Sequence, residues 1–444
     1  MNSTKVDMAV TRSSGGNASL ALPGPETIHR QILSNGMTAL VWENHASPSV
    51  VIEGYLRAGQ VCEPAEKAGL AGFTATMLMR GTETRTFTEI NEIIESVGAS
   101  LNISAGRHVT GFSGKSLAED LGLLLDVLAD VLRRPTFPPE YVERVRGQTL
   151  TALQERDNDT RRQAALAFRE LAYPPDHPYS RSGLGYQETI TAITRDDLST
   201  FYSNYYSPEG SIIVVVGAVR ADQVFAQLEE ALGGWTVSRR GREPTLPEVP
   251  PLSEIKGRKV VLPGKTQSDI VLGFPAIPRT HPDWFVASVA NTVLGRFGMG
   301  GRLGDNVREK QGMAYYAYST LEATNGPGAW MAIAGVNPVN VERAVESIVA
   351  EIKRICEEPI DENELADSQA FLTGSLPLRL ETNQGVANTL LDMEWYGLGL
   401  DYVLRYPDLV NSVTPEQVLE VCRRYLKSDA YALAIAGPNE TETT

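Results

Sequence analysis

Arg308 and Tyr315 are the residues of this sequence best suited to chemistry, within a stretch rich in glycine, charge and tyrosine that runs from Gly295 to Ser319. Tyr315 follows Arg308 by seven residues, and Gly312 lies between them. A guanidinium on a helix and a phenol on the next strand could therefore converge across a turn at Gly312. Both groups donate hydrogen bonds, so together they could hold a carbonyl oxygen or an oxyanion. A second interpretation stays open, in which a glycine ends an ordinary helix, the arginine faces water and the tyrosine belongs to the core.

Glycines and apolar periodicity predict the elements that position this pair. Gly298, Gly300 and Gly301 permit a positive φ or the close approach of another chain. Residues 302–311 contain no helix breaker and are predicted to form a helix, which Gly312 ends. The tyrosines that follow alternate with smaller residues, as in a half-buried strand.

Length and composition restrict the possible classes of protein. The 444 residues exceed one compact core and predict at least two domains. The net charge of −15 disfavours nucleic acid and anionic membrane as partners. Three widely spaced cysteines indicate neither a disulfide framework nor a cysteine-based zinc site. Residues 1–25 lack the apolar centre of a signal peptide, so we expect a disordered tail and a cytoplasmic protein.

The first half is predicted to alternate strands and helices. The predicted strands are 38–42, 49–56, 101–104, 109–113 and 211–216, the first two forming a pair joined through a turn at 44–48. The predicted helices are 69–80, 87–97 with Thr86 or Thr88 as cap, 117–132, 140–168 or beyond, and one capped by Thr194.

An internal repeat organises the whole chain. Residues 194–217 align without a gap on residues 414–437. The same offset relates residues 40–52 to 260–272 and residues 69–80 to 289–300. We therefore predict two homologous α+β domains in a clamshell arrangement, each a mixed, mainly antiparallel sheet with helices packed on one face. The predicted boundaries are 26–238 and 257–438, with a linker at 239–256 and a tail at 439–444.

Common catalytic motifs are missing from the sequence. No pair of the five histidines has the spacing of zinc ligands on one helix. No Gly-x-Ser-x-Gly motif occurs, and the glycines near 300 do not complete a nucleotide-binding pattern. A cleft between two similar domains would nevertheless be a natural ligand site.

The chain resembles the pitrilysin or insulinase type of peptidase, a family that includes the mitochondrial processing peptidase and the core proteins of respiratory complex III. The resemblance covers residues 26–437 and rests on the duplication together with three motifs. The motifs are RGT at 80–82, DHPYSRSGLG at 176–185 and GGRLGDNVREKQGMAYYAYS at 300–319.

The resemblance implies that the zinc motif of the family is absent here. Catalytic members carry His-x-x-Glu-His on the helix before RGT, with two zinc ligands and a general base. Gly72 and Thr76 occupy the two histidine positions, and Ala75 occupies the glutamate position. The distal glutamate of the family would fall near residues 151–152, and Glu155 is a turn away. We therefore expect no metal and no other cofactor in this chain, and zinc in a partner subunit.

By the same resemblance, Arg308 and Tyr315 match the residues that the second half of the family contributes opposite the zinc. These hold the substrate backbone and its developing oxyanion. The implied substrate-binding residues are Gly300, Gly301, Leu101, Asn102, Ile103 and Ser104.

The predicted function is thus a zinc-less subunit of a heterodimeric metalloendopeptidase that hydrolyses peptides and pairs with a homologous zinc-bearing subunit. In isolation the chain could instead form a homodimer. Two alternatives stay open: a non-enzymatic structural or assembly protein, as the respiratory core proteins are, and a standalone peptide-binding module.

Overall fold

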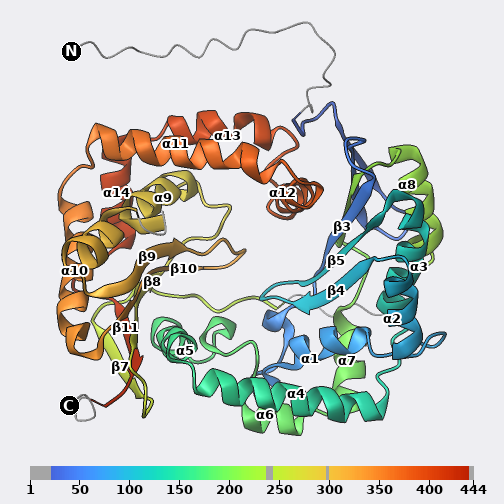
Figure 1. Cartoon of the computed structure of the whole chain (residues 1–444), viewed down its shortest axis with the longest axis horizontal. Helices are drawn as coiled ribbons and strands as arrows, with labels where there is room; N and C mark the ends of the chain where they lie inside the picture. The colour runs from blue at the N-terminus through green and yellow to red at the C-terminus, as the bar shows by residue number, and fades with distance from the viewer. Residues whose placement is uncertain (1–21, 237–243, 297–299, 440–444) are drawn as a thin grey trace, which may run out of the picture.

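Two β-sheets organise the computed structural model, which describes residues 22–236, 244–296 and 300–439 (Figure 1). The first sheet has the order β1-β2-β6-β3-β5-β4 and the second has the order β7-β11-β8-β10-β9. The strands of the first sheet are β1 Ile28–Ile32, β2 Thr38–Glu43, β3 Ser49–Leu56, β4 Ser100–Ala105, β5 Thr110–Leu117 and β6 Ile212–Gly217. The strands of the second are β7 Lys256–Val261, β8 Ser268–Pro275, β9 Ala314–Leu321, β10 Ala329–Val336 and β11 Ala432–Gly437.

Helices connect these strands in both halves. The helices before residue 240 are α1 Leu70–Leu78, α2 Phe87–Ser96, α3 Leu121–Arg133, α4 Pro139–Asp157, α5 Thr160–Ala172, α6 Gln187–Ala192, α7 Arg195–Tyr205 and α8 Ala221–Leu228. The later helices are α9 Trp284–Asn291, α10 Val341–Glu357, α11 Glu362–Arg379, α12 Asn383–Trp395, α13 Tyr402–Asn411 and α14 Pro415–Tyr425.

The repeat predicted from the sequence is visible in the topology, and the α+β fold class is confirmed. Helix α7 and strand β6 recur as α14 and β11 at the predicted offset. Both sheets are antiparallel except for one parallel pair in each, β2 with β6 and β7 with β11. The helix α9 departs from the offset, because it begins at Trp284, before the predicted start at 289.

The predicted pairing of strands 38–42 and 49–56, which correspond to β2 and β3, is wrong. Strand β6 lies between β2 and β3, parallel to the first and antiparallel to the second. All residues of β6 are buried, and the strand is apolar throughout. A strand buried on both faces is most stable at the centre of a sheet, so β6 separates two strands that are neighbours in the chain.

Each sheet is covered on both faces, and one of the covering helices comes from the other half of the chain. Val41 and Ile52 of the first sheet share a core with the helices of their own half, whereas Leu40 and Val214 pack with α12. In the second sheet, Val271 packs in the core that includes α5. Figure 1 shows α12 beside the blue sheet and α5 beside the yellow and red one. The prediction of helices on one face therefore omitted this exchange, which ties the two halves together.

Residues 140–168 form two helices, where the sequence predicted one. Helix α4 ends at Asp157 and α5 begins at Thr160. The Asp159 side chain accepts a hydrogen bond from the backbone N–H of Arg162 at 2.9 Å, which stabilises a new helix start. The caps predicted at Thr86 and Thr194 are confirmed, each within a reciprocal capping box.

The predicted linker and tails lie partly outside the described residues. Residues 244–255 contain no helix or strand, and β7 begins at Lys256. The domain boundaries themselves stay predictions. No helix in the described part of the chain is both long and apolar enough to cross a lipid bilayer.

Candidate functional site

Tyr315 lies in a β-bulge on the edge strand of the second sheet. Strand β9 pairs only with β10 in the described sheet, and Gly335 pairs with Tyr316 whereas Val336 pairs with Ala314. Tyr315 is therefore the extra residue of β9 at this point. Its side chain is 68% exposed. Bulges re-aim side chains and are common beside active sites, so the phenol is accessible to a ligand.

Arg308 lies on a π-helical turn, Gly304–Lys310, that leads into β9. The sequence predicted an ordinary helix here, and π turns often occur at functional sites. Gly312 ends the turn with φ +64°, and its N–H donates to the Arg308 carbonyl at 3.0 Å, as predicted for a glycine cap. The side chain of Arg308 is 30% exposed, with its Nε 3.7 Å from Oε1 of Glu309.

The described residues show no hydrogen bond between Arg308 and Tyr315. Arg308 precedes the Gly312 turn and Tyr315 follows it, and both side chains retain hydrogen-bond donors for a ligand. Oxyanion donors that bind a ligand are not required to bind each other, so this arrangement is compatible with the predicted pair.

A glycine before the π turn, Gly301, allows a close approach to the backbone of Gly295. Gly301 has φ +84°, and a Cβ there would lie 2.7 Å from the Cα of Gly295. A side chain at this position would collide with backbone, which explains the glycine. Gly300 and Gly301 line a cavity of about 840 Å³. Gly298 lies outside the described residues.

Arg302 supports this loop, a role that its sequence context does not predict. Its Nε and Nη2 donate to both carboxylate oxygens of Glu364 on α11, at 2.7 and 2.8 Å. This two-point contact fixes the start of the π turn, and the guanidinium is held rigidly. The partner lies on a distant segment of the chain, so no local sequence signal could have revealed it.

The predicted substrate-binding segment, Leu101–Ser104, forms the middle of the edge strand β4. In the described sheet β4 pairs only with β5. Ile103 is buried, whereas Asn102 and Ser104 are exposed. The open edge presents backbone N–H and C=O groups that an extended peptide could pair with.

The helix α1 carries the three positions of the missing zinc motif. Gly72 and Thr76 lie one turn apart, and the Thr76 hydroxyl donates to the Gly72 carbonyl at 3.0 Å. Ala75 is fully buried in the core. Glu155 on α4 is exposed to solvent. The described residues contain no group of three histidine, cysteine or acidic side chains placed to hold a metal ion.

Comparisons with known proteins identify the family. Residues 39–175 match the model described as Insulinase (Peptidase family M16), and residues 192–372 match the Peptidase M16 inactive domain. The chain belongs to peptidase family M16. An uncharacterized zinc protease of Mycobacterium leprae is 28% identical over 421 residues, 94% of this chain and 93% of that protein. The mitochondrial-processing peptidase subunit beta of Rattus norvegicus is 25% identical over 440 residues, 97% of this chain and 88% of that protein.

Solved structures share the M16 fold along nearly the whole chain. An M16 inactive domain from Pseudomonas fluorescens superposes with a TM-score of 0.85 at 23% identity, covering 93% of this chain and 98% of that one. A protease from Helicobacter pylori superposes with a TM-score of 0.87 at 21% identity, covering 93% and 99%. These likenesses confirm the fold predicted from the duplication and the motifs.

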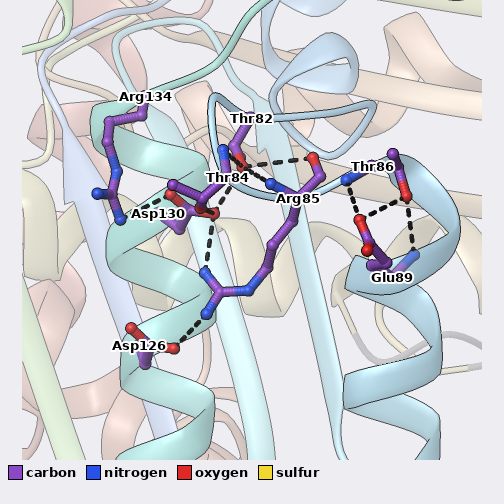
Figure 2. Close-up of polar contacts among 8 residues, drawn as sticks. All are labelled: Thr82, Thr84, Arg85, Thr86, Glu89, Asp126, Asp130 and Arg134. Carbon is purple, nitrogen blue, oxygen red and sulfur yellow. Dashed lines mark hydrogen bonds and ion pairs between the residues drawn. The ribbon is translucent and has the colours of Figure 1, made fainter.

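The RGT motif that pointed to the M16 family has a structural role in this chain (Figure 2). Its Thr82 donates to the buried carboxylate of Asp130 at 2.6 Å, and Arg85 and Arg134 form ion pairs with Asp130 at 2.8 Å. Burial alone raises the pKa of the Asp130 carboxyl, but hydrogen bonds from Thr82, Thr84 and Arg85 outweigh burial and hold that pKa below its usual value. The motif thus anchors the end of α1 to α3.

The second M16 motif, DHPYSRSGLG, lies where the two halves meet. Tyr179 of this motif is buried, and its phenol contacts His108. Arg107 stacks over the Tyr179 ring at 4.4 Å and pairs with Glu322 of the second half. Burial alone raises the pKa of the Glu322 carboxyl, but Arg169 and Arg107 lower it further than burial raises it. This charged junction holds the end of β9 against the first half.

Proposed function

We propose that this chain is the zinc-less subunit of a two-subunit M16 metalloendopeptidase. The observation that carries the proposal is that Tyr315, 68% exposed, lies in a bulged edge strand and that Arg308 lies on the π turn leading into this strand. Neither residue is needed to fill the core. The helix α1 supplies no ligand in place of the missing zinc motif, so the metal would have to come from a homologous partner.

The proposed role of Arg308 and Tyr315 is to bind the peptide carbonyl that becomes an oxyanion. The partner's zinc would polarise that oxygen and activate water. The phenol and the guanidinium would donate hydrogen bonds to the same oxygen, and these bonds strengthen as negative charge develops. Their effect should therefore appear mainly in kcat, with little change in KM.

The substrate in this proposal is an extended peptide. The open edge of β4 and the cavity lined by Gly300 and Gly301 offer contacts that do not depend on the side chains of the peptide. The name of the rat relative, a mitochondrial-processing peptidase subunit, supports an assembly of more than one chain. We infer a cytoplasmic location, with which three cysteines in the thiol form are compatible.

Co-expression with an M16 chain that carries His-x-x-Glu-His tests the proposal. Zinc content and cleavage of a peptide library would be measured for each chain alone and for the complex. We expect zinc in the partner only and cleavage by the complex only. Near-stoichiometric zinc in the pure isolated chain, or a mixture that neither associates nor gains activity, would refute the proposal.

A further inference from the structure

A cavity of about 300 Å³ in the second half is lined by a buried arginine. Arg279 is 9% exposed and lines this cavity. Across the described residues no acidic side chain lies within ion-pair distance of its guanidinium. A buried charge is costly unless a partner compensates for it, so the cavity favours an anionic ligand.

Aromatic rings hold the guanidinium of Arg279 in one orientation. Its centre lies 5.1 Å from the ring of Trp284, 5.4 Å from Phe285 and 5.6 Å from Tyr402. One nitrogen, Nη2, donates to the Tyr402 hydroxyl at 2.8 Å. These contacts fix the plane of the guanidinium and use one of its five N–H groups, which leaves donors for a ligand.

A second unsatisfied group in the cavity is a hydrogen-bond acceptor. Asn291 is 2% exposed, and its Oδ1 has no hydrogen-bond partner in the described structure. The backbone carbonyl of Asn291 is already used, because it accepts from the Ser319 hydroxyl at 2.9 Å. A ligand that satisfies both buried groups would therefore carry a negative charge and, beside it, an N–H donor.

The three charged side chains that line the cavity, Arg279, Arg379 and Asp392, carry more positive than negative charge. Burial raises the pKa of the Asp392 carboxyl to about 6, although Arg279 and Arg379 act to lower it. Two arginines thus face one carboxylate, in a chain whose overall net charge is −15. The cavity volume is at the lower end of the range for ligand pockets, about 300–1,000 Å³.

We propose that this cavity binds the free α-carboxylate of a peptide, with Arg279 and Arg379 on the carboxylate and Asn291 Oδ1 on the N–H of the terminal residue. The choice of a peptide rests on the proposed function. Thr320 also lines the cavity and lies five residues from Tyr315 on β9. At about 3.3 Å per residue this is roughly 17 Å, so the site is distinct from the oxyanion pair.

Calorimetric titration of the isolated chain tests this inference without a partner or zinc. The probes are N-acetyl-penta-alanine with a free carboxylate, the same peptide as its C-terminal amide, and inorganic phosphate. We expect the free acid to bind at least about tenfold more tightly than the amide, because amidation removes the charge that both arginines recognise. Equal binding of the two peptides, or phosphate binding as tightly as the free acid, would overturn the assignment.

Substitutions locate the binding to the cavity. Arg379→Gln changes an exposed side chain and should weaken binding of the free acid several-fold without affecting folding. Arg279→Lys keeps the charge but not the planar fork, and should also weaken binding. Arg343→Gln, an exposed arginine on α10, is the matched control and should bind like the unmodified chain. Unchanged binding in both cavity variants would contradict the proposal. If the isolated chain binds the free-acid peptide but the unmodified two-subunit complex cleaves no peptide, the result would count against the proposed function alone.

Discussion

Two regions of the chain differ in their backbone conformation. The helix α1 carries the positions of the missing zinc motif, and the β9 edge, with the π turn that leads into it, carries the candidate donor pair. At the missing zinc motif, α1 is a regular helix. The Thr76 hydroxyl donates a hydrogen bond to the Gly72 carbonyl of the same helix, and the Ala75 side chain is buried in the core. The β9 edge instead combines a bulge at Tyr315, a π turn at Arg308 and a left-handed Gly312.

This difference shows which region still has features that packing alone does not require. Bulges, π turns and left-handed residues interrupt regular hydrogen bonding and cost stability, and they concentrate at functional sites. The helix α1 has no such feature between Leu70 and Leu78. This contrast supports the proposed role of the β9 edge, whereas α1 has only structural features between those two residues.

The largest expected effect is on catalysis by the proposed complex. Tyr315→Phe removes one oxyanion donor and should lower kcat on the order of 10²-fold to 10³-fold, equivalent to about 2.7–4 kcal/mol. Folding, pairing and the partner's zinc should be unchanged, because the side chain is exposed. Steady-state kinetics of peptide cleavage check this prediction.

Tyr205→Phe is the matched control for the loss of a phenolic hydroxyl. Tyr205 lies on α7 in the first half of the chain, whereas Tyr315 lies on β9 in the second sheet. The control variant should cleave at the unmodified rate. If Tyr315→Phe also cleaves at that rate, then the tyrosine is structural and the pair has no catalytic role.

A smaller effect is expected for the stability of the α1 region. Asp130→Ala should lower the free energy of unfolding by about 3 kcal/mol, near the lower end for a broken buried ion pair, because Arg85 and Arg134 keep some contact with water. Since the pKa of Asp130 is lowered by folding, its stabilising contribution is present above about pH 4 and is lost as the pH falls further.

Urea unfolding of the variant and the unmodified chain at pH 7 and pH 3 measures this contribution. The difference in unfolding free energy should be large at pH 7 and shrink at pH 3. A difference that is the same at both pH values would show that Asp130 stabilises α3 without its charge.

Much of the fold could be predicted from the sequence because local patterns and the repeat carry it. The caps at Thr86 and Thr194 and the turn at Gly312 are local signals, and the constant offset between the halves is a repeated one. The strand order was mispredicted for the opposite reason. Strand β6 inserts between β2 and β3 although seven α-helices, α1 to α7, and two strands separate it from β3 along the chain. No neighbouring residue indicates that placement.

The candidate site was only partly predictable for the same physical reason. Residue types indicated Arg308 and Tyr315, whereas the bulge that exposes Tyr315 depends on its register with β10. The Glu364 partner of Arg302 and the cavity at Arg279 also arise from segments that are distant in the sequence. Helix α5 packs on the second sheet and α12 packs on the first sheet. Apolar periodicity could not predict this packing, because it indicates the apolar face of a helix but not the element that covers that face.

The smallest expected effects come from two alanine substitutions that compare the regions directly. Gly72→Ala should raise the free energy of unfolding by about 0.5–1 kcal/mol, because alanine is the better helix former and the new Cβ would meet only the Gly183 carbonyl at 3.7 Å. Gly301→Ala should lower it by about 1–3 kcal/mol, because φ is +84° and the Cβ would press on Gly295. Urea denaturation of the two variants measures both. Opposite signs would show that α1 tolerates an ordinary side chain while the loop before β9 requires glycine; a Gly301→Ala variant as stable as the unmodified chain would contradict the backbone strain inferred there.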